Sequence, residues 1–234
     1  MKLCVYCGTF NPIHNVHIAV ANFVKTHFDF DTILFIPAYK PPHKNIDDDL
    51  ANHRYAMVKM AIEGDEKFSI SNIEFRHERY SYTFNTMEQL YKMYPNIEGK
   101  ISFIIGTDAF RQIEDWYKAD ELKELVNFIV FPREEDFKAE KLERLRPLGY
   151  NFICVNMPFI NVSSTVLRSR IKHGKPVGAL IPQCVKDYIK ENGLYTEDEN
   201  NWWNKSMFKR NFKRGALFSL VGCCRLRKRF SAKV

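Results

Sequence analysis

The stretch CGTFNPIHNVH, residues 7–17, decides the fold of this chain. The short apolar run before it, residues 3–6, predicts a buried strand. The apolar spacing of residues 18–24, just after it, predicts a helix packed on a sheet. Gly8 permits close backbone approaches that a Cβ atom forbids. The sequence therefore predicts a strand, a tight glycine loop and a helix, in that order.

Two histidines lie where this helix is expected to begin, at Asn11, Pro12 or Asn15. His14 and His17 are three residues apart, so both rings share one face if they lie on the first turn. Exposed N–H groups at a helix start bind anions, and the pattern predicts a phosphate site. An isolated pair is also typical of polar surface or of a metal site, but no third and fourth ligand stands at sensible spacing.

This stretch resembles the G-G-T-F-D-P-I-H-x-G-H signature of the bacterial nicotinate-nucleotide adenylyltransferases, members of the HxGH nucleotidyltransferase superfamily. Cys7 and Val16 stand where the signature has Gly, and Asn11 stands where it has Asp. In the superfamily, the glycine at the position of Val16 lets the nucleotide base lie close to the helix backbone. A branched side chain there could crowd that base.

A second anion-binding pattern is NVSSTVLR, residues 161–168. Ser163, Ser164 and Thr165 suit a helix start, where they present hydroxyl and N–H groups to an anion. Arg168 follows on the next turn and can bind the same anion through its guanidinium. The segment resembles the superfamily's I-S-S-T-x-x-R, and the family's G-x-x-x-x-x-L-I-P-x-x-V-x-x-Y-I follows at residues 174–189.

Three further segments resemble the same family. Residues 37–44 resemble its P-x-x-x-P-P-H-K loop beside the active site, which makes Lys40, His43 and Lys44 candidate phosphate contacts. From spacing alone, that segment is a surface loop fixed by its prolines. Residues 52–62 resemble the family's H-R-x-x-M-x-x-x-A helix, and we expect its apolar positions in the core. Residues 76–86 resemble its R-x-x-G-x-S-Y-T-x-D-T loop, where Ser81 or Thr83 would cap a helix.

Strand patterns recur along the chain and alternate with helical ones. They lie at residues 3–6, 32–36, 68–75, 100–105, 125–131 and 150–155, whereas the charged residues 134–146 suggest a solvated helix face or a mobile loop. We therefore expect a Rossmann-like α/β fold, a doubly wound and mostly parallel sheet with helices on both faces. Ligands bind beyond the carboxyl ends of such strands, where Gly106 and Asp108 fall. Asp108 suits a ribose hydroxyl or a metal-bound phosphate, or it caps the next helix.

Composition is that of a folded domain with a basic appendage. Of 234 residues, 45% are hydrophobic and 27% charged, and neither a signal pattern nor an apolar run of about 18 residues occurs, so we expect a cytoplasmic protein. The six cysteines are scattered, which indicates reduced packing thiols. The net charge of +7 lies wholly in residues 197–234, with ten Lys and Arg against three Asp and Glu. We expect no nucleic-acid partner.

This charge distribution divides the chain into a nucleotidyltransferase domain, residues 1–196, and a basic C-terminal tail, residues 197–234. The tail suits either a disordered segment or an amphipathic helix with weak contact to an anionic membrane. The helix would bury an apolar face that recurs every four residues, formed by Phe208, Phe212, Ala216, Leu220 and Cys224.

The family resemblance implies transfer of AMP from ATP to nicotinate mononucleotide, with Mg²⁺ bound to ATP and no metal ligand assigned to a protein side chain. It implies catalytic roles for His14, His17 and Arg168. The implied ATP site consists of Gly8, Thr9, Phe10, His14, His17, Gly106, Asp108, Ser163, Ser164, Thr165 and Arg168. The implied acceptor site consists of Lys44, Thr83, Thr86, Trp116, Tyr117 and Arg133, with Trp116 stacked on the pyridine ring and N–H groups near Thr86 and Tyr117 taking its carboxylate.

Two other functions stay open. One is another adenylyltransferase of the superfamily, acting on nicotinamide mononucleotide or phosphopantetheine; by resemblance, the Ser-Tyr-Thr loop and the Trp-Tyr pair favour the nicotinate form. The other is a nucleotide-binding module that has lost catalysis through Val16, against which both histidines and Arg168 count. A P-loop kinase is disfavoured because GxxxxGKS is missing, and the lack of an evident nucleophile favours direct transfer. Both a monomer and a homo-oligomer are compatible with the sequence.

Overall fold

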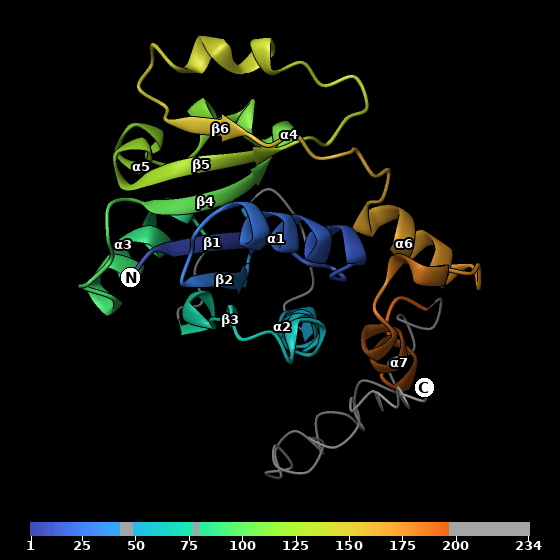
Figure 1. The fold of residues 1–234 in the computed structure, drawn as a ribbon. Helices are drawn as coiled ribbons and strands as arrows, with labels where there is room; N and C mark the ends of the chain where they lie inside the picture. The colour runs from blue at the N-terminus through green and yellow to red at the C-terminus, as the bar shows by residue number, and fades with distance from the viewer. Residues whose placement is uncertain (43–48, 77–79, 197–234) are drawn as a thin grey trace, which may run out of the picture.

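The strands of the computed structural model, which describes residues 1–42, 49–76 and 80–196, form one parallel sheet (Figure 1). Its order is β3-β2-β1-β4-β5-β6, and every pairing is parallel. The strands are β1 Leu3–Gly8, β2 Thr32–Pro37, β3 Phe68–Ile70, β4 Ile101–Gly106, β5 Val126–Phe131 and β6 Phe152–Cys154. The direction of winding reverses between β1 and β4, as it does in doubly wound dinucleotide-binding sheets. The predicted fold class is confirmed.

Helices cover both faces of this sheet, because successive strand residues point to opposite sides. Cys4 and Tyr6 of β1 belong to one core, and Leu3 and Val5 belong to the other. The first core packs against α1 Asn15–His27, α2 Asp49–Ile62, α6 Ser164–Lys172 and α7 Gln183–Glu191. The second packs against α3 Thr83–Met93, α4 Thr107–Phe110 and α5 Ala119–Leu125.

The strand predicted over residues 68–75 is wrong beyond Ile70. The Ser71 hydroxyl accepts the N–H of Ile73 at 3.2 Å, and the Asn72 carbonyl accepts the N–H of Phe75 at 2.9 Å. These bonds turn the chain into a 3₁₀ helix, η1 (Ile73–Arg76). A serine hydroxyl offers the backbone such a local partner in place of a sheet ladder.

Two more expectations on the far side of the sheet need correction. The strand expected at residues 150–155 shortens to β6. The helix face expected in the charged segment 134–146 is confirmed in part, because Ala139–Leu145 forms a 3₁₀ helix whose charged side chains are exposed but whose leucines are not. Leu142 and Leu145 of that helix are fully buried in the second core, and they anchor the charged side chains around them.

The N-cap residues of α6 and α3 mark where the loops before these two helices end. Ser163 caps α6 as predicted, accepting the N–H of Val166 at 3.3 Å. At α3 the prediction is wrong, because the N-cap residue is Tyr82 and no side chain caps it. The Ser81 hydroxyl accepts the backbone N–H of Lys40 at 3.2 Å instead.

Several predictions fall outside the described residues. These are the candidate contacts His43 and Lys44, the tail helix, its membrane contact and the tail side of the domain boundary. Within residues 1–42, 49–76 and 80–196, no helix combines the length and the apolar character that a membrane span requires. The first core ends along the chain with Leu194 and Tyr195, which are 6% and 4% exposed.

Candidate active site

The histidine loop, residues 8–17, leaves the carboxyl end of β1 beside the reversal point of the sheet. A Cβ atom on Gly8 would lie 2.9 Å from Cζ of Phe10, so the glycine serves a close approach. The left-handed backbone belongs to Phe10, with φ of 47°, and its ring is 2% exposed. The buried ring therefore anchors the loop on the sheet.

The two histidine rings stack on each other at the start of α1. Their centroids are 3.6 Å apart, with 23° between the planes. The backbone N–H of His14 donates to Nδ1 of His17 at 3.2 Å, which puts the proton of a neutral His17 ring on Nε2. Phe10 meets the His17 ring edge to face at 5.0 Å. Sequence spacing predicted this shared face.

Burial keeps His14 neutral near pH 7. The residue is 1% exposed, and desolvation lowers its pKa to about 4, assisted by the positive charge of Arg133. A bound polyphosphate would oppose both effects because its negative charge favours the imidazolium form. The charge of His14 would then depend on whether a polyphosphate is bound.

The start of α6 docks against the histidine loop, although about 150 residues of sequence separate them. Arg168 donates from Nη1 to the carbonyl of Asn11 at 2.8 Å, and the Ser164 hydroxyl donates to the carbonyl of Pro12 at 3.0 Å. The Tyr195 hydroxyl donates to Oδ1 of Asn11. The first turns of α1 and α6, both predicted anion sites, therefore lie side by side.

The carboxyl ends of β4 and β5 complete this edge of the sheet. A Cβ atom on Gly106 would lie 2.6 Å from Oδ1 of Asp108 and 2.7 Å from Cγ of Arg133. Arg133 Nε lies 3.7 Å from Asp108 Oδ2, and the Arg133 N–H donates to the Thr107 hydroxyl at 3.0 Å. The helix-cap alternative for Asp108 is wrong, because Gly106 is the N-cap of α4. The Asp108 side chain is 63% exposed, so solvent reaches its carboxylate.

Of the predicted acceptor residues, Thr83, Thr86 and Tyr117 lie at or beside the start of α3, whereas Arg133 lies with Asp108. The Tyr117 ring packs at a tilt on Tyr82, with ring centroids 4.7 Å apart, and Tyr117 is 46% exposed. The Thr86 N–H already donates to the Tyr82 carbonyl at 3.2 Å. The N–H groups of α3 that lack a partner inside the helix are therefore those of the residues before Thr86, beginning with Thr83. Trp116 meets Phe103 edge to face at 6.3 Å and packs, partly buried, against the second core. Part of its side chain stays accessible.

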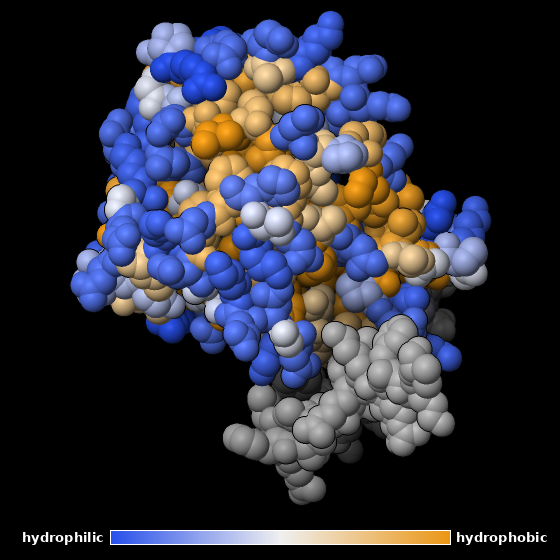
Figure 2. All heavy atoms as spheres, in the orientation of Figure 1, coloured by the Kyte–Doolittle hydropathy of each residue, from blue (hydrophilic) through white to orange (hydrophobic). Residues whose placement is uncertain are grey.

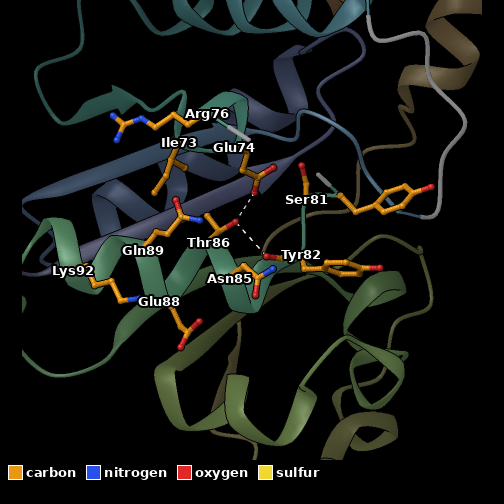
Figure 3. A pocket seen from close by; sticks show the side chains of 11 residues that line it. Ile73, Glu74, Arg76, Ser81, Tyr82, Asn85, Thr86, Glu88, Gln89 and Lys92 are labelled. Carbon is orange, nitrogen blue, oxygen red and sulfur yellow. Dashed lines mark hydrogen bonds between the residues drawn. The ribbon is translucent and has the colours of Figure 1, made fainter. Parts of the chain in front are cut away.

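A polar cavity of about 760 Å³ runs between η1 and α3 (Figure 3). Glu74 and Arg76 line it from η1, and Asn85 and Thr86 line it from α3. Figure 3 shows the Glu74 carboxylate pointing toward Thr86 and Ser81.

Two charged residues that sequence reasoning did not assign to the site are Arg54 of α2 and Glu74 of η1. Arg54 is fully buried and donates to the Thr9 carbonyl at 2.8 Å, inside the histidine loop. Glu74 accepts the Thr86 hydroxyl at 2.8 Å. The only available signals were the H-R-x-x-M match and a glutamate near a strand end, and neither implies burial.

Comparison with known proteins identifies the family of this chain. The cytidylyltransferase-like family model matches residues 5–170. The chain is 40% identical over 195 residues to the nicotinate-nucleotide adenylyltransferase of Bacillus subtilis (strain 168), covering 83% of this chain and 98% of that protein.

Solved structures agree in fold. Plasmodium falciparum nicotinic acid mononucleotide adenylyltransferase complexed with NaAD matches with a TM-score of 0.71 and 20% identity, over 83% of this chain and 97% of that one. The same protein complexed with APC gives 0.68 and 19%, over 83% and 96%. Since the family model spans more than half of the chain and the Bacillus relative aligns over nearly its whole length, this protein belongs to the nicotinate-nucleotide adenylyltransferases of the cytidylyltransferase-like family.

Proposed function

We propose that the protein transfers AMP from ATP to nicotinate mononucleotide and releases pyrophosphate. The observation that carries this proposal is the docking of the α6 start on the histidine loop, which brings two helix starts together with Arg168. This arrangement supports a single anion site that also uses His17. Family membership indicates which reaction to expect. The N–H groups of the two helix starts and the Arg168 guanidinium support a substrate that carries several phosphates.

The reaction forms one bond and breaks one bond. An oxygen of the mononucleotide phosphate attacks the α-phosphorus of ATP, and the bond from that phosphorus to the bridging oxygen of pyrophosphate breaks. Such transfer needs reactants in line and positive charge on the phosphate oxygens, with little covalent help from the protein. His17 and His14 would contact the ATP phosphates. Arg168 and the turn of Ser163 to Thr165 would hold the β and γ groups.

Mg²⁺ is part of this proposal as a partner of ATP. The described residues contain no group of three or more His, Cys, Asp or Glu side chains placed to hold a metal. Mg²⁺ characteristically keeps several waters and binds phosphate oxygens with one or two carboxylates. The exposed carboxylate of Asp108 fits that donor set. When bound, the ion would neutralise phosphate charge.

The acceptor is proposed to lie at the start of α3. Helix-start N–H groups and the positive end of the helix favour a carboxylate over a neutral amide. Tyr82 and Tyr117 form an aromatic wall there, and the accessible part of Trp116 would stack on the pyridine ring. These features support nicotinate as the preferred acceptor over nicotinamide. Arg133, beside His14, would face the negative charge shared by both substrates.

A pyrophosphate-release assay tests the proposal. Purified full chain with ATP and Mg²⁺ should turn over nicotinate mononucleotide much faster than nicotinamide mononucleotide or phosphopantetheine. Preference for either of the last two would assign the protein to another branch of the superfamily. ATP binding without turnover of any acceptor would favour the module that has lost catalysis. We place the reaction in the cytoplasm, as the sequence led us to expect.

A further inference from the structure

Two loops of the candidate active site meet at the buried guanidinium of Arg54. It donates to the carbonyls of Thr9 at 2.8 Å, Ala38 at 2.5 Å and Tyr39 at 2.9 Å. Thr9 belongs to the histidine loop, and the other two begin the segment that follows β2. The N–H of Ala38 also donates to the Gly8 carbonyl at 2.9 Å. Arg54 thus fixes the distance between these two loops.

Glu74 joins the acceptor side to the same point. Its Oε1 accepts the Thr86 hydroxyl at 2.8 Å, in the first turns of α3. Burial raises the pKa of Glu74, and this is opposed by the hydroxyls of Ser81 and Thr86, by the Tyr39 backbone and by the charge of Arg54. Glu74 therefore holds α3 through Thr86, while the charge of Arg54 makes only the smallest of these contributions to its pKa.

The third connection runs directly between loops. The Ser81 N–H donates to the Lys40 carbonyl at 2.9 Å, and the Lys40 N–H donates to the Ser81 hydroxyl at 3.2 Å. The segment after β2 is consequently bonded to the histidine loop on one side and to the start of α3 on the other. Arg54 and Glu74 sit where these bonds converge.

We infer that Arg54 and Glu74 are positioning residues that hold the acceptor pocket at α3 in register with the histidine loop. The inference rests on the proposed function, because it takes the start of α3 as the acceptor site. Neither residue touches the reacting atoms. Arg54 acts through Thr9 and Tyr39, and Glu74 acts through Thr86. Loss of the Glu74 contact should therefore affect the acceptor more than ATP.

Substitutions along the Glu74 to Thr86 bond separate positioning from simple stability. Glu74→Gln keeps the shape and removes the charge, and Thr86→Val removes the hydroxyl while keeping the backbone. Each should raise KM for nicotinate mononucleotide about tenfold, the usual scale for one hydrogen bond to a charged group, with KM for ATP unchanged within twofold. The polar cavity beside Glu74 lets water replace the lost bond, so both variants should stay folded.

Three further variants make the test specific. Thr86→Ser retains the hydroxyl and should restore KM close to the wild-type value. The double variant Glu74→Gln with Thr86→Val should resemble either single variant, since both break the same contact. Glu88→Gln changes an exposed glutamate on the rim of the same cavity and should leave both KM values unchanged.

Steady-state kinetics of all five variants, run well below the Tm of each, tests whether Glu74 positions the acceptor pocket through Thr86. A Thr86→Val variant with a lowered Tm and an unchanged acceptor KM would overturn the inference, as would multiplicative effects in the double variant. If Glu74→Gln does not fold, the comparison of Val with Ser at position 86 carries the test alone. A wild-type chain that binds ATP but neither binds nor uses nicotinate mononucleotide would overturn the proposed function, and the inference with it.

Discussion

At the scale of single residues, the site depends on groups whose charge the fold controls. His14 is buried in its neutral form, with a pKa of about 4, and only the unfolded chain takes up its proton near pH 6.5. Stability from this residue is therefore complete above pH 6.5 and falls as the pH drops toward 4. The loss amounts to roughly 1.4 kcal/mol for each pH unit in that window.

Urea unfolding of the wild type and of His14→Gln at pH 7.5 and pH 5.5 measures this contribution. The wild type should lose about 1.4 kcal/mol more than the variant between the two pH values, because glutamine does not titrate. Groups that titrate in both proteins cancel in the comparison. Equal losses would mean that His14 is accessible to protons in the folded state.

His17 has a different task, since its ring is oriented by a bond from the His14 backbone. His17→Ala should reduce turnover about a hundredfold or more, the scale seen when one donor to a developing negative charge is removed. His27→Ala, at the far end of the same helix, is the matched control and should retain activity. The pyrophosphate-release assay checks both, and a near-normal rate in His17→Ala would refute its assigned role.

Arg54 and Glu74 mark the limit of sequence reasoning at this scale. Arginine and glutamate are almost never fully buried unless they are paired, so their default assignment is to the surface. The contacts that satisfy these two side chains depend on loops from three distant parts of the chain arriving at one place. Motif spacing predicted His14, His17 and Arg168 because each needs only its own helix start to be placed correctly.

At the scale of elements, the start of α1 raises the question of Val16. It is the second residue of the helix and packs, partly buried, against the first core. Val16→Gly should therefore cost more than the roughly 1 kcal/mol of helix propensity, because burial of the side chain is lost too. Binding of ATP should be unchanged or tighter, since the substitution opens space near the helix backbone.

Urea unfolding and calorimetric titration with ATP measure the two effects separately. A cost well below 1 kcal/mol would show that Val16 does not contribute to the core. Weaker ATP binding would show that the valine is part of the nucleotide site.

Element boundaries were predicted where hydrophobic periodicity was unopposed. β1, β2, β4 and β5 are buried strands flanked by helices, and the expected ranges match them within one or two residues. The strand predicted over residues 68–75 ends at Ile70 because the Ser71 hydroxyl accepts the N–H of Ile73 and a 3₁₀ turn follows, despite the alternating apolar residues. The turn that results delivers Glu74 to α3, so the failure of the pattern coincides with a residue of the site.

At the scale of the whole molecule, the two cores draw only on residues from the first 195 positions among those described, and α7 closes the first core with Val185 and Ile189. Tyr195 holds this end of the described chain against the histidine loop, because its hydroxyl donates a hydrogen bond to Asn11. We propose residues 1–196 as the nucleotidyltransferase domain. A chain truncated after Thr196 should then fold with an unchanged Tm and unchanged turnover, measured by thermal melting and pyrophosphate release.

The basic tail, residues 197–234, would in turn account for any attraction to anionic surfaces, since it holds the whole excess positive charge. The full chain should sediment with anionic vesicles at low salt and dissociate as salt rises, because such contacts are screened beyond about 8 Å at physiological ionic strength. The truncated chain should stay in the supernatant at every salt concentration. If truncation instead causes aggregation or loss of turnover, Trp202, Trp203 or Phe208 contributes to the domain, and the boundary belongs further along the chain.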